Sequence, residues 1–144
     1  MTKAIQQSVE FDVSPETLYE MYIDSKKHSL ATGGPAKLGR RAGAPFTAFA
    51  GKLRGKNLMV VPNKMIVQSW RAMGWKKAEP DSILTLTFSK TKSGGRVDLV
   101  HVNVPEHDHQ GVTDGWENYY WKPWRAYIAA TAPKKRRRPP FILI

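Results

Sequence analysis

Apolar and polar residues alternate along much of the chain, which is the pattern of strands with one buried face. The first strand is expected over residues 4–13, where apolar positions from Ile5 to Val13 mostly alternate with polar ones. Turn signals at residues 62–63 and 93–95 separate later strands, at the spacing of an antiparallel meander. We expect these strands near residues 46–50, 52–61, 64–73, 82–90 and 95–104.

A short helix is expected directly after the first strand. Ser14-Pro15-Glu16 supplies an N-cap, a proline at the first helical position and an acidic residue in the first turn. Leu18, Met21 and Tyr22 follow at helical spacing and mark the buried face. We expect this helix to end near Ser25, with the basic residues 26–28 in its closing turn.

The last element is a helix rich in aromatic residues. Asp114 followed by Glu117 resembles a capping box at its start, with an earlier start near Glu106 as the alternative. Pro123 has no N–H to donate to the carbonyl of Tyr119, so a bend is expected there. At about 100° per residue, one face carries Trp116, Tyr120, Pro123, Tyr127 and Ala130, with Tyr119 and Trp124 at its margins and Asn118, Lys122 and Arg125 opposite.

These elements predict an α+β protein in which the long helix covers an antiparallel sheet of about six strands. Residues 32–45 are rich in glycine, proline and basic residues and are expected to form a loop, with at most one turn of helix. A chain of 144 residues suits one domain. We place that domain at residues 1–131, followed by a basic and apolar tail at residues 132–144.

The composition is that of a soluble globular protein, with 41% hydrophobic and 24% charged residues. No apolar run approaches the ~20 residues of a membrane span, and the first residues lack the apolar core of a signal peptide. We therefore expect a cytoplasmic protein. The chain has no cysteine, which excludes a disulfide framework, a thiol nucleophile and thiolate zinc ligands.

Positive charge is spread over the chain and concentrated in its tail. Lysine and arginine number 23 against 12 acidic residues, a formal charge of +11, and five of the positive residues are adjacent. The remainder is still 11 − 5 = +6, so the protein should favour anionic surfaces with salt-sensitive affinity. The tail is interpreted as a solvated segment, with nuclear import or contact with nucleic acid or acidic lipid as alternatives. Its basic residues are Lys134, Lys135, Arg136, Arg137 and Arg138.

Three stretches together resemble the domain found at the C-terminal end of activators of the Hsp90 ATPase, in the START-like (Bet v 1-like, SRPBCC) superfamily. They are Ala48-Phe49-Ala50-Gly51, the run LMVVPNKMIVQSW from Leu58 to Trp70, and Gly115-Trp116-Glu117-Asn118-Tyr119-Tyr120-Trp121. The likeness extends from about Ile5 to Tyr127. It implies a helix-grip fold, in which a curved antiparallel sheet grips a long C-terminal helix and a cavity is often left between them.

The resemblance has two departures. In the co-chaperones this domain follows a separate N-terminal domain that makes much of the contact with the chaperone, and 144 residues leave no room for it. The segment after Trp75, residues 76–81, also differs from the family, which usually has a tryptophan-proline turn with Gly-His-Tyr nearby. Neither the co-chaperone activity nor a role of that loop is therefore carried over directly.

The aromatic helix and the tryptophans of the sheet form the candidate binding site. Trp116, Tyr120 and Tyr127 either fill the core or line an apolar pocket, where tyrosine hydroxyls would orient a polar group of a ligand. Arg71 would meet a ligand carboxylate through two hydrogen bonds if it points inward, and otherwise points to solvent. The candidate residues are Trp70, Arg71, Trp75, Trp116, Tyr119, Tyr120, Trp124 and Tyr127.

The sequence contains no organised motif for metal binding or catalysis. His107 and His109, beside Glu106 and Asp108, lack a third ligand at a recognisable spacing, so we interpret them as a solvated polar loop. No nucleophile elbow, phosphate-binding loop or paired-carboxylate pattern is present. We expect neither a metal nor another cofactor and assign no catalytic residue.

The leading hypothesis is a non-enzymatic START-like domain that binds a small apolar or amphipathic ligand under the C-terminal helix. The alternative is a protein-interaction module that associates with an Hsp90-type chaperone through its basic surface. An enzyme working inside the pocket is a third reading, which rests on analogy with other START-like proteins. Nucleic acid is expected to bind only through the basic tail, if at all.

Overall fold

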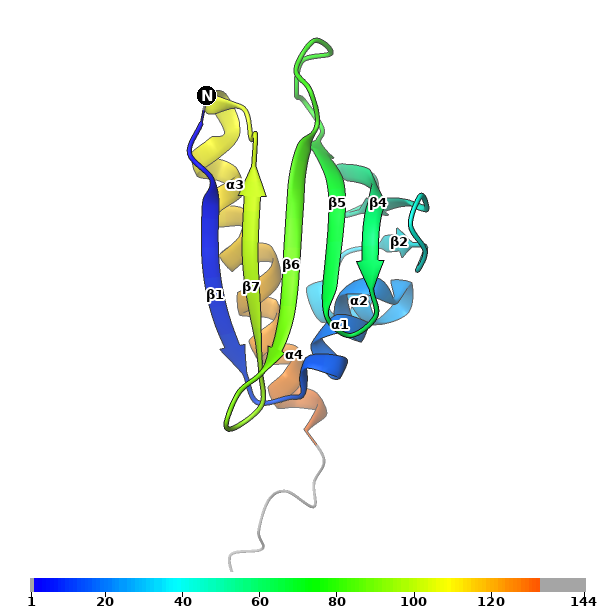
Figure 1. Cartoon of the computed structure of the whole chain (residues 1–144), viewed down its shortest axis with the longest axis vertical. Coiled ribbons are helices and arrows are strands. Elements are labelled where there is room, and N and C mark those ends of the chain that lie inside the picture. Colours follow the sequence, from blue (N-terminus) through cyan, green and yellow to red (C-terminus); the bar gives the residue numbers. More distant parts are fainter. Residues whose placement is uncertain (1, 133–144) are drawn as a thin grey trace, which may run out of the picture.

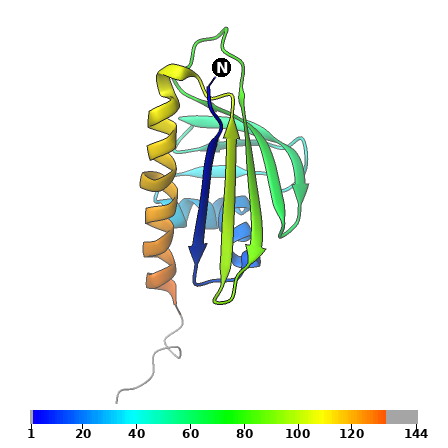
Figure 2. The same cartoon turned by 60° about the vertical axis from the view of Figure 1, so that its left-hand side comes forward.

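The computed structural model describes residues 2–132, which form one curved antiparallel sheet with helices on one face (Figures 1 and 2). Seven strands lie in the spatial order β1-β7-β6-β5-β4-β3-β2. The N-terminal strand therefore pairs with the last one, while the other neighbours follow the chain. The strands are β1 (Ile5–Phe11), β2 (Ala36–Leu38), β3 (Pro45–Ala48), β4 (Leu53–Val61), β5 (Met65–Ala72), β6 (Ser82–Lys90) and β7 (Gly95–Val102).

The six predicted strands are all present, and the seventh was missed. β2 lies in the segment 32–45 that we expected to be a loop, where it pairs with β3 in the register Ala36 to Ala48. Its three residues are too few to show an alternation of apolar and polar positions. They are held in place by tertiary contacts, because the hydroxyls of Ser25 and Ser29 accept hydrogen bonds from the N–H groups of Leu38 and Ala36.

Two short helices follow β1. The predicted start of α1 (Pro15–Ile23) is confirmed, since the Ser14 hydroxyl accepts a hydrogen bond from the N–H of Thr17. The predicted end near Ser25 is wrong in one respect. Asp24 ends α1 and caps α2 (Ser25–Thr32), so the basic residues 26–28 open a second helix instead of closing the first.

The C-terminal helix runs from residue 106 to residue 131 along the sheet (Figure 2). The earlier start near Glu106 is confirmed. Asp114 lies inside the helix and accepts a hydrogen bond from the Gln110 amide, so the capping-box interpretation is wrong. The helix comprises η1 (Glu106–Asp108), α3 (His109–Trp116), the π-helical turn η2 (Glu117–Trp121) and α4 (Lys122–Thr131).

The π-helical turn changes which residues face the core. The N–H of Lys122 bonds to the carbonyl of Glu117, five residues back, so one extra residue enters the turn ahead of Pro123. The positions after this turn are therefore shifted by about one residue relative to a regular helical wheel. Trp121 and Trp124 are fully buried, whereas the predicted core positions Pro123 and Tyr127 are half-buried and Ala130 is exposed. A wide π-helical turn thus lies just before Pro123, the position at which we expected a bend.

The helices and the sheet enclose one aromatic core. All helices of residues 2–132 pack on the same face, and within this range the opposite face, which is toward the viewer in Figure 1, carries no helix. No helix within residues 2–132 is long and apolar enough to cross a membrane. The basic residues of the tail, Lys134 to Arg138, lie outside the described residues, so the predicted boundary of the domain at residue 131 stays a prediction.

Candidate functional site

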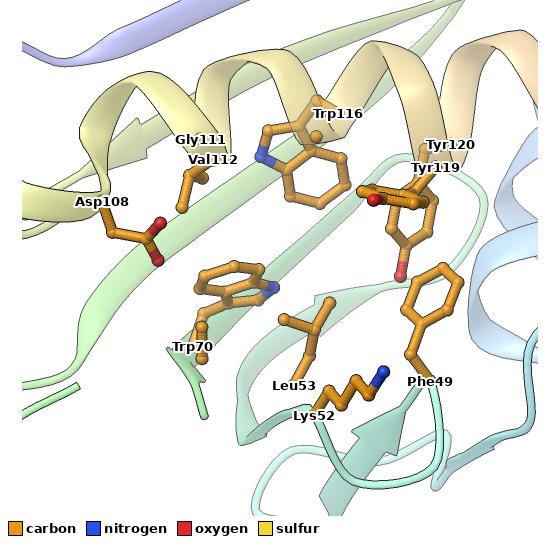
Figure 3. A pocket seen from close by; sticks show the side chains of 12 residues that line it. Phe49, Lys52, Leu53, Trp70, Asp108, Gly111, Val112, Trp116, Tyr119 and Tyr120 are labelled. Carbon is orange, nitrogen blue, oxygen red and sulfur yellow. The ribbon is translucent and has the colours of Figure 1, made fainter. Parts of the chain in front are cut away.

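A pocket of about 320 Å³ opens between the first half of the C-terminal helix and the β3–β5 side of the sheet (Figure 3). The helix contributes small residues there, Gly111, Val112 and Gly115, before the aromatic residues begin. The space left by these small side chains is what keeps the pocket open. The full lining consists of Phe49, Lys52, Leu53, Trp70, Ala72, Asp108, Gly111, Val112, Gly115, Trp116, Tyr119 and Tyr120.

The turn between β3 and β4 places Phe49 at the rim. Phe49, Ala50 and Gly51 all have positive φ angles, of 52°, 57° and 87°, so two non-glycine residues adopt the left-handed conformation. The Phe49 ring lies 5.8 Å from the rings of both Tyr119 and Tyr120, measured between centroids. The turn thereby brings an aromatic side chain across to the helix.

Glycine is required beneath that ring. A Cβ atom on Gly34 would lie 2.5 Å from Cδ1 of Phe49, closer than such atoms approach in folded proteins. The residue at position 34 must therefore lack a side chain for Phe49 to keep this position. Phe49 and Lys52 were not among the predicted site residues, although the Ala48-Phe49-Ala50-Gly51 stretch was part of the resemblance.

Trp116 is anchored to the sheet through a buried histidine. The Trp116 indole donates to Nδ1 of His101 at 3.1 Å, and Nε2 of His101 lies 2.8 Å from the Ser82 hydroxyl, which donates to the Trp70 carbonyl at 2.7 Å. This series of hydrogen bonds fixes His101 in the neutral tautomer that carries its proton on Nε2. Burial lowers the pKa of His101 to about 3, and the nearby His109 adds to the effect.

Tyr120 is anchored in the same way to α2. Nδ1 of His28 donates to the Tyr22 carbonyl at 2.7 Å, and its Nε2 accepts from the Tyr120 hydroxyl at 2.8 Å. Burial lowers the pKa of His28 to about 4, although its hydrogen bond to Tyr22 opposes the shift. Burial also raises the pKa of the Tyr120 phenol well above its usual value, so this hydroxyl remains a donor.

The Tyr22 hydroxyl continues the polar network into the sheet. It donates to the Gln68 amide oxygen at 2.8 Å, and the Gln68 amide donates to the side chain of Asn57 at 2.9 Å. Asn57 in turn donates to the carbonyls of Gly39 and Arg41. These buried polar groups satisfy one another, so the network holds α1, α2, β4 and β5 in one arrangement.

The predicted site residues divide into two groups. Trp70, Trp116, Tyr119 and Tyr120 line the pocket, and Trp75, Arg71, Trp124 and Tyr127 do not. The Trp75 indole donates to Asp108 at 2.7 Å, and Arg71 pairs with Asp81 at 2.7 Å while its guanidinium lies 5.9 Å from the Trp75 ring centroid. Trp124 packs against Phe11 and Trp121 in the core.

The remaining histidines make separate polar contacts. Nε2 of His107 lies 3.0 Å from the Glu79 carboxylate, and Nε2 of His109 lies 2.8 Å from the carbonyl of Lys3. Across residues 2–132, no three histidine, cysteine or acidic side chains are grouped so as to hold a metal ion.

Comparison with known proteins identifies relatives over most of the chain. A family model described as Activator of Hsp90 ATPase homolog 1-like protein matches residues 12–128. A Dictyostelium discoideum protein named activator of 90 kDa heat shock protein ATPase homolog is 28% identical over 81% of this chain and 30% of its own length. Its human counterpart, homolog 1, is 29% identical over 78% of this chain and 33% of its own length. The chain thus spans about a third of the curated relatives it matches.

Solved structures share the fold. An HSP90 activator from Plasmodium falciparum superimposes with a TM-score of 0.79 at 21% identity, over 88% of this chain and 96% of that one. A Mesorhizobium loti protein gives 0.78 at 17% identity, over 91% of this chain and all of the other. At these identities the likeness establishes the helix-grip architecture.

The two buried histidines predict a loss of stability in acid. Both are neutral in the fold and protonate near pH 6.5 when unfolded, so the unfolded chain binds more protons between pH 6.5 and 4. Their contribution to the free energy of unfolding is complete above pH 6.5 and falls below it, by about 1.4 kcal/mol per pH unit for each histidine. Urea unfolding measured at several pH values should show this slope.

The variant His28→Asn separates this effect from the titration of carboxylates. Asparagine can keep a donor for the Tyr22 carbonyl but does not titrate, so the slope should fall by about half of the histidine contribution, roughly 1.4 kcal/mol per pH unit. An unchanged slope in the variant would show that His28 is not held neutral by the fold.

Proposed function

The chain belongs to the Activator of Hsp90 ATPase homolog 1-like family of the START-like superfamily, and from this premise we propose that it is a non-enzymatic binding domain for a small apolar or amphipathic molecule. The site is the pocket between the C-terminal helix and the sheet. A volume of about 320 Å³ falls at the lower end of ligand pockets in proteins, which span roughly 300–1,000 Å³. This pocket is the observation that carries the proposal.

The walls of the pocket support an apolar ligand. Trp70, Trp116 and Tyr120 present aromatic rings, and Leu53 and Val112 add aliphatic surface (Figure 3). Rings held by hydrogen bonds and packing lose little freedom when a ligand contacts them. Such a preformed site therefore binds at a small cost in conformational entropy.

The titratable groups near the pocket support a binding role over a catalytic one. Both ring nitrogens of His28 and of His101 are engaged in hydrogen bonds, so neither ring offers a free base to a ligand. The carboxylate of Asp108 accepts from the Trp75 indole. His28, His101 and Asp108 thus act as structural anchors of the pocket walls.

A second candidate function is association with an Hsp90-type chaperone. Relatives named as activators of the Hsp90 ATPase, the formal charge of +11 and the helix-free face of the sheet all favour it. Paired positions place Met59, Val67, Thr85 and Val100 in one row across that face, with the side chains of Met59 and Val100 exposed. Basic residues Arg54 and Lys56 lie on the same face. The two functions use opposite faces and are compatible.

Filling the pocket should abolish ligand binding without unfolding the domain. A Cβ atom on Gly115 would make an ordinary 3.6 Å contact with Tyr119, so Gly115→Leu can project into the pocket. Titration with N-phenyl-1-naphthylamine, a neutral apolar dye, should give a saturable fluorescence increase with the wild type and none with this variant.

The matched control is Gly115→Ala. It adds one methyl group at the same position, should retain dye binding, and should raise the free energy of unfolding by about 0.5–1 kcal/mol because alanine replaces a helical glycine. Equal dye binding by the wild type and by a folded Gly115→Leu protein would show that the pocket is not the binding site.

The chaperone function predicts a salt-sensitive interaction. The chain should bind a purified Hsp90-type chaperone and change its ATPase rate, and both effects should weaken as ionic strength rises because exposed charges are screened. Charge reversal at Arg54 and Lys56 should weaken binding further. Absence of both binding and a rate change at low salt would eliminate this candidate.

A further inference from the structure

We propose that the pocket selects small molecules that carry a carboxylate on an apolar body, with the Trp70 indole N–H as hydrogen-bond donor and Lys52 as the positive charge at the mouth. This inference rests on the proposed binding function and names the chemical class of the ligand. Its three supports are an unsatisfied donor, a charge gradient along the pocket and the apolar character of the walls between them.

The unsatisfied donor is Nε1 of Trp70. The residue is 4% exposed, and its Nε1 has no acceptor among residues 2–132. A buried N–H without a partner costs about 1–3 kcal/mol, so such groups are uncommon in folded proteins. Figure 3 shows this nitrogen on the edge of the ring that faces Leu53 and is turned away from Asp108. The donor thus faces the pocket.

The other tryptophans show that this arrangement is specific to the pocket. The indoles of Trp75, Trp116 and Trp121 donate to Asp108, His101 and Gln7, respectively. Trp124 also has an unsatisfied Nε1, but it is fully buried and does not line the pocket. Of the chain's five tryptophans, Trp70 alone combines an unsatisfied N–H with a place in the lining of the pocket.

Charge is unequally distributed along the pocket. Lys52 lies exposed in the β3–β4 turn beside Phe49, and within residues 2–132 no acidic group lies within salt-bridge distance of its ammonium. Asp108 lies at the far end of the pocket, where its carboxylate would repel another carboxylate (Figure 3). A ligand anion is therefore favoured at the Lys52 end of the pocket, the side toward which the Trp70 N–H is turned (Figure 3).

The apolar walls require the rest of the ligand to be apolar. Trp116, Val112 and Leu53 offer no charge, and burying a polar body against them would leave its groups without partners. An acid with an aromatic or aliphatic body can accept the hydrogen bond, pair with the positive charge and pack against the apolar walls. A neutral apolar molecule would satisfy the walls alone.

The test compares ligands that differ only in the polar group. Two bodies, naphthalene and an eight-carbon chain, are each supplied as carboxylate, methyl ester and hydrocarbon, and their affinities are measured by displacement of N-phenyl-1-naphthylamine. The ester carbonyl can accept a hydrogen bond from Trp70 but carries no charge. The hydrocarbon can neither accept a hydrogen bond nor carry a charge. We expect the carboxylate to bind about tenfold more tightly than the ester, and the ester severalfold more tightly than the hydrocarbon.

Two variants assign these differences to residues. Trp70→Phe keeps an aromatic wall but removes the N–H, so the advantage of the ester over the hydrocarbon should vanish. Lys52→Gln removes the charge at an exposed position, so the carboxylate should lose its advantage over the ester. Trp124→Phe is the control, because it removes an indole N–H that is also unsatisfied but belongs to a residue outside the pocket lining.

Indole N–H resonances of the wild type provide a readout that does not depend on a stable Trp70 variant. On addition of 2-naphthoate, the ¹H resonance of Trp70 should shift downfield, as expected for a new hydrogen bond, while that of Trp124 stays in place. Displacement of the dye with equal affinity by all three members of a series would overturn this inference and leave the binding function standing. Failure of the dye and of every compound to bind would overturn both.

Discussion

Two hydrogen bonds from the C-terminal helix to buried neutral histidines fix how that helix lies on the rest of the protein. Trp116 donates to His101 in the sheet, and Tyr120 donates to His28 in α2. The two donors are one helical turn apart and point to different elements, so together they set the rotation and the height of the helix. Because each histidine is already bonded on its other nitrogen, neither anchor can move without leaving a buried polar group unpaired.

The pocket follows from what lies on either side of these anchors. Beyond them the π-helical turn brings both Trp121 and Trp124 into the core, which fills the space between helix and sheet. On their N-terminal side the helix carries Gly111 and Gly115, which have no side chain to fill the space between helix and sheet. The same helix is therefore a packed wall at one end and the roof of an apolar pocket at the other.

Much of the fold could be predicted because alternation and helix-start signals are local. β1 and the five later strands, the Ser14 cap and the long helix all carry such signals. β2 could not be predicted, since its three residues become a strand only through pairing with β3. The π-helical turn has no local signature either, so a regular wheel placed Tyr127 in the core and Trp124 at its margin. Burial of the large Trp121 and Trp124 rings against the sheet is what reverses this order.

The site could be predicted in part for the same reason. Aromatic type and position on the sheet or helix identified Trp70, Trp116 and Tyr120, but Phe49 and Lys52 reach the pocket through a turn whose left-handed residues are not glycine. Arg71 depends on Asp81, ten residues away and on the other side of a loop, which no pattern reveals. Which Trp N–H lacks a partner is likewise decided by tertiary structure.

Native mass spectrometry of the protein purified from its own host shows whether the pocket holds a ligand. We expect a second species, heavier than the bare chain by one small molecule, which is released on activation and is identified as an acid with an apolar body. The Gly115→Leu protein prepared in the same way should show the bare mass alone. A bare mass for both proteins, or the same adduct on both, would contradict the claim that this pocket is a ligand site.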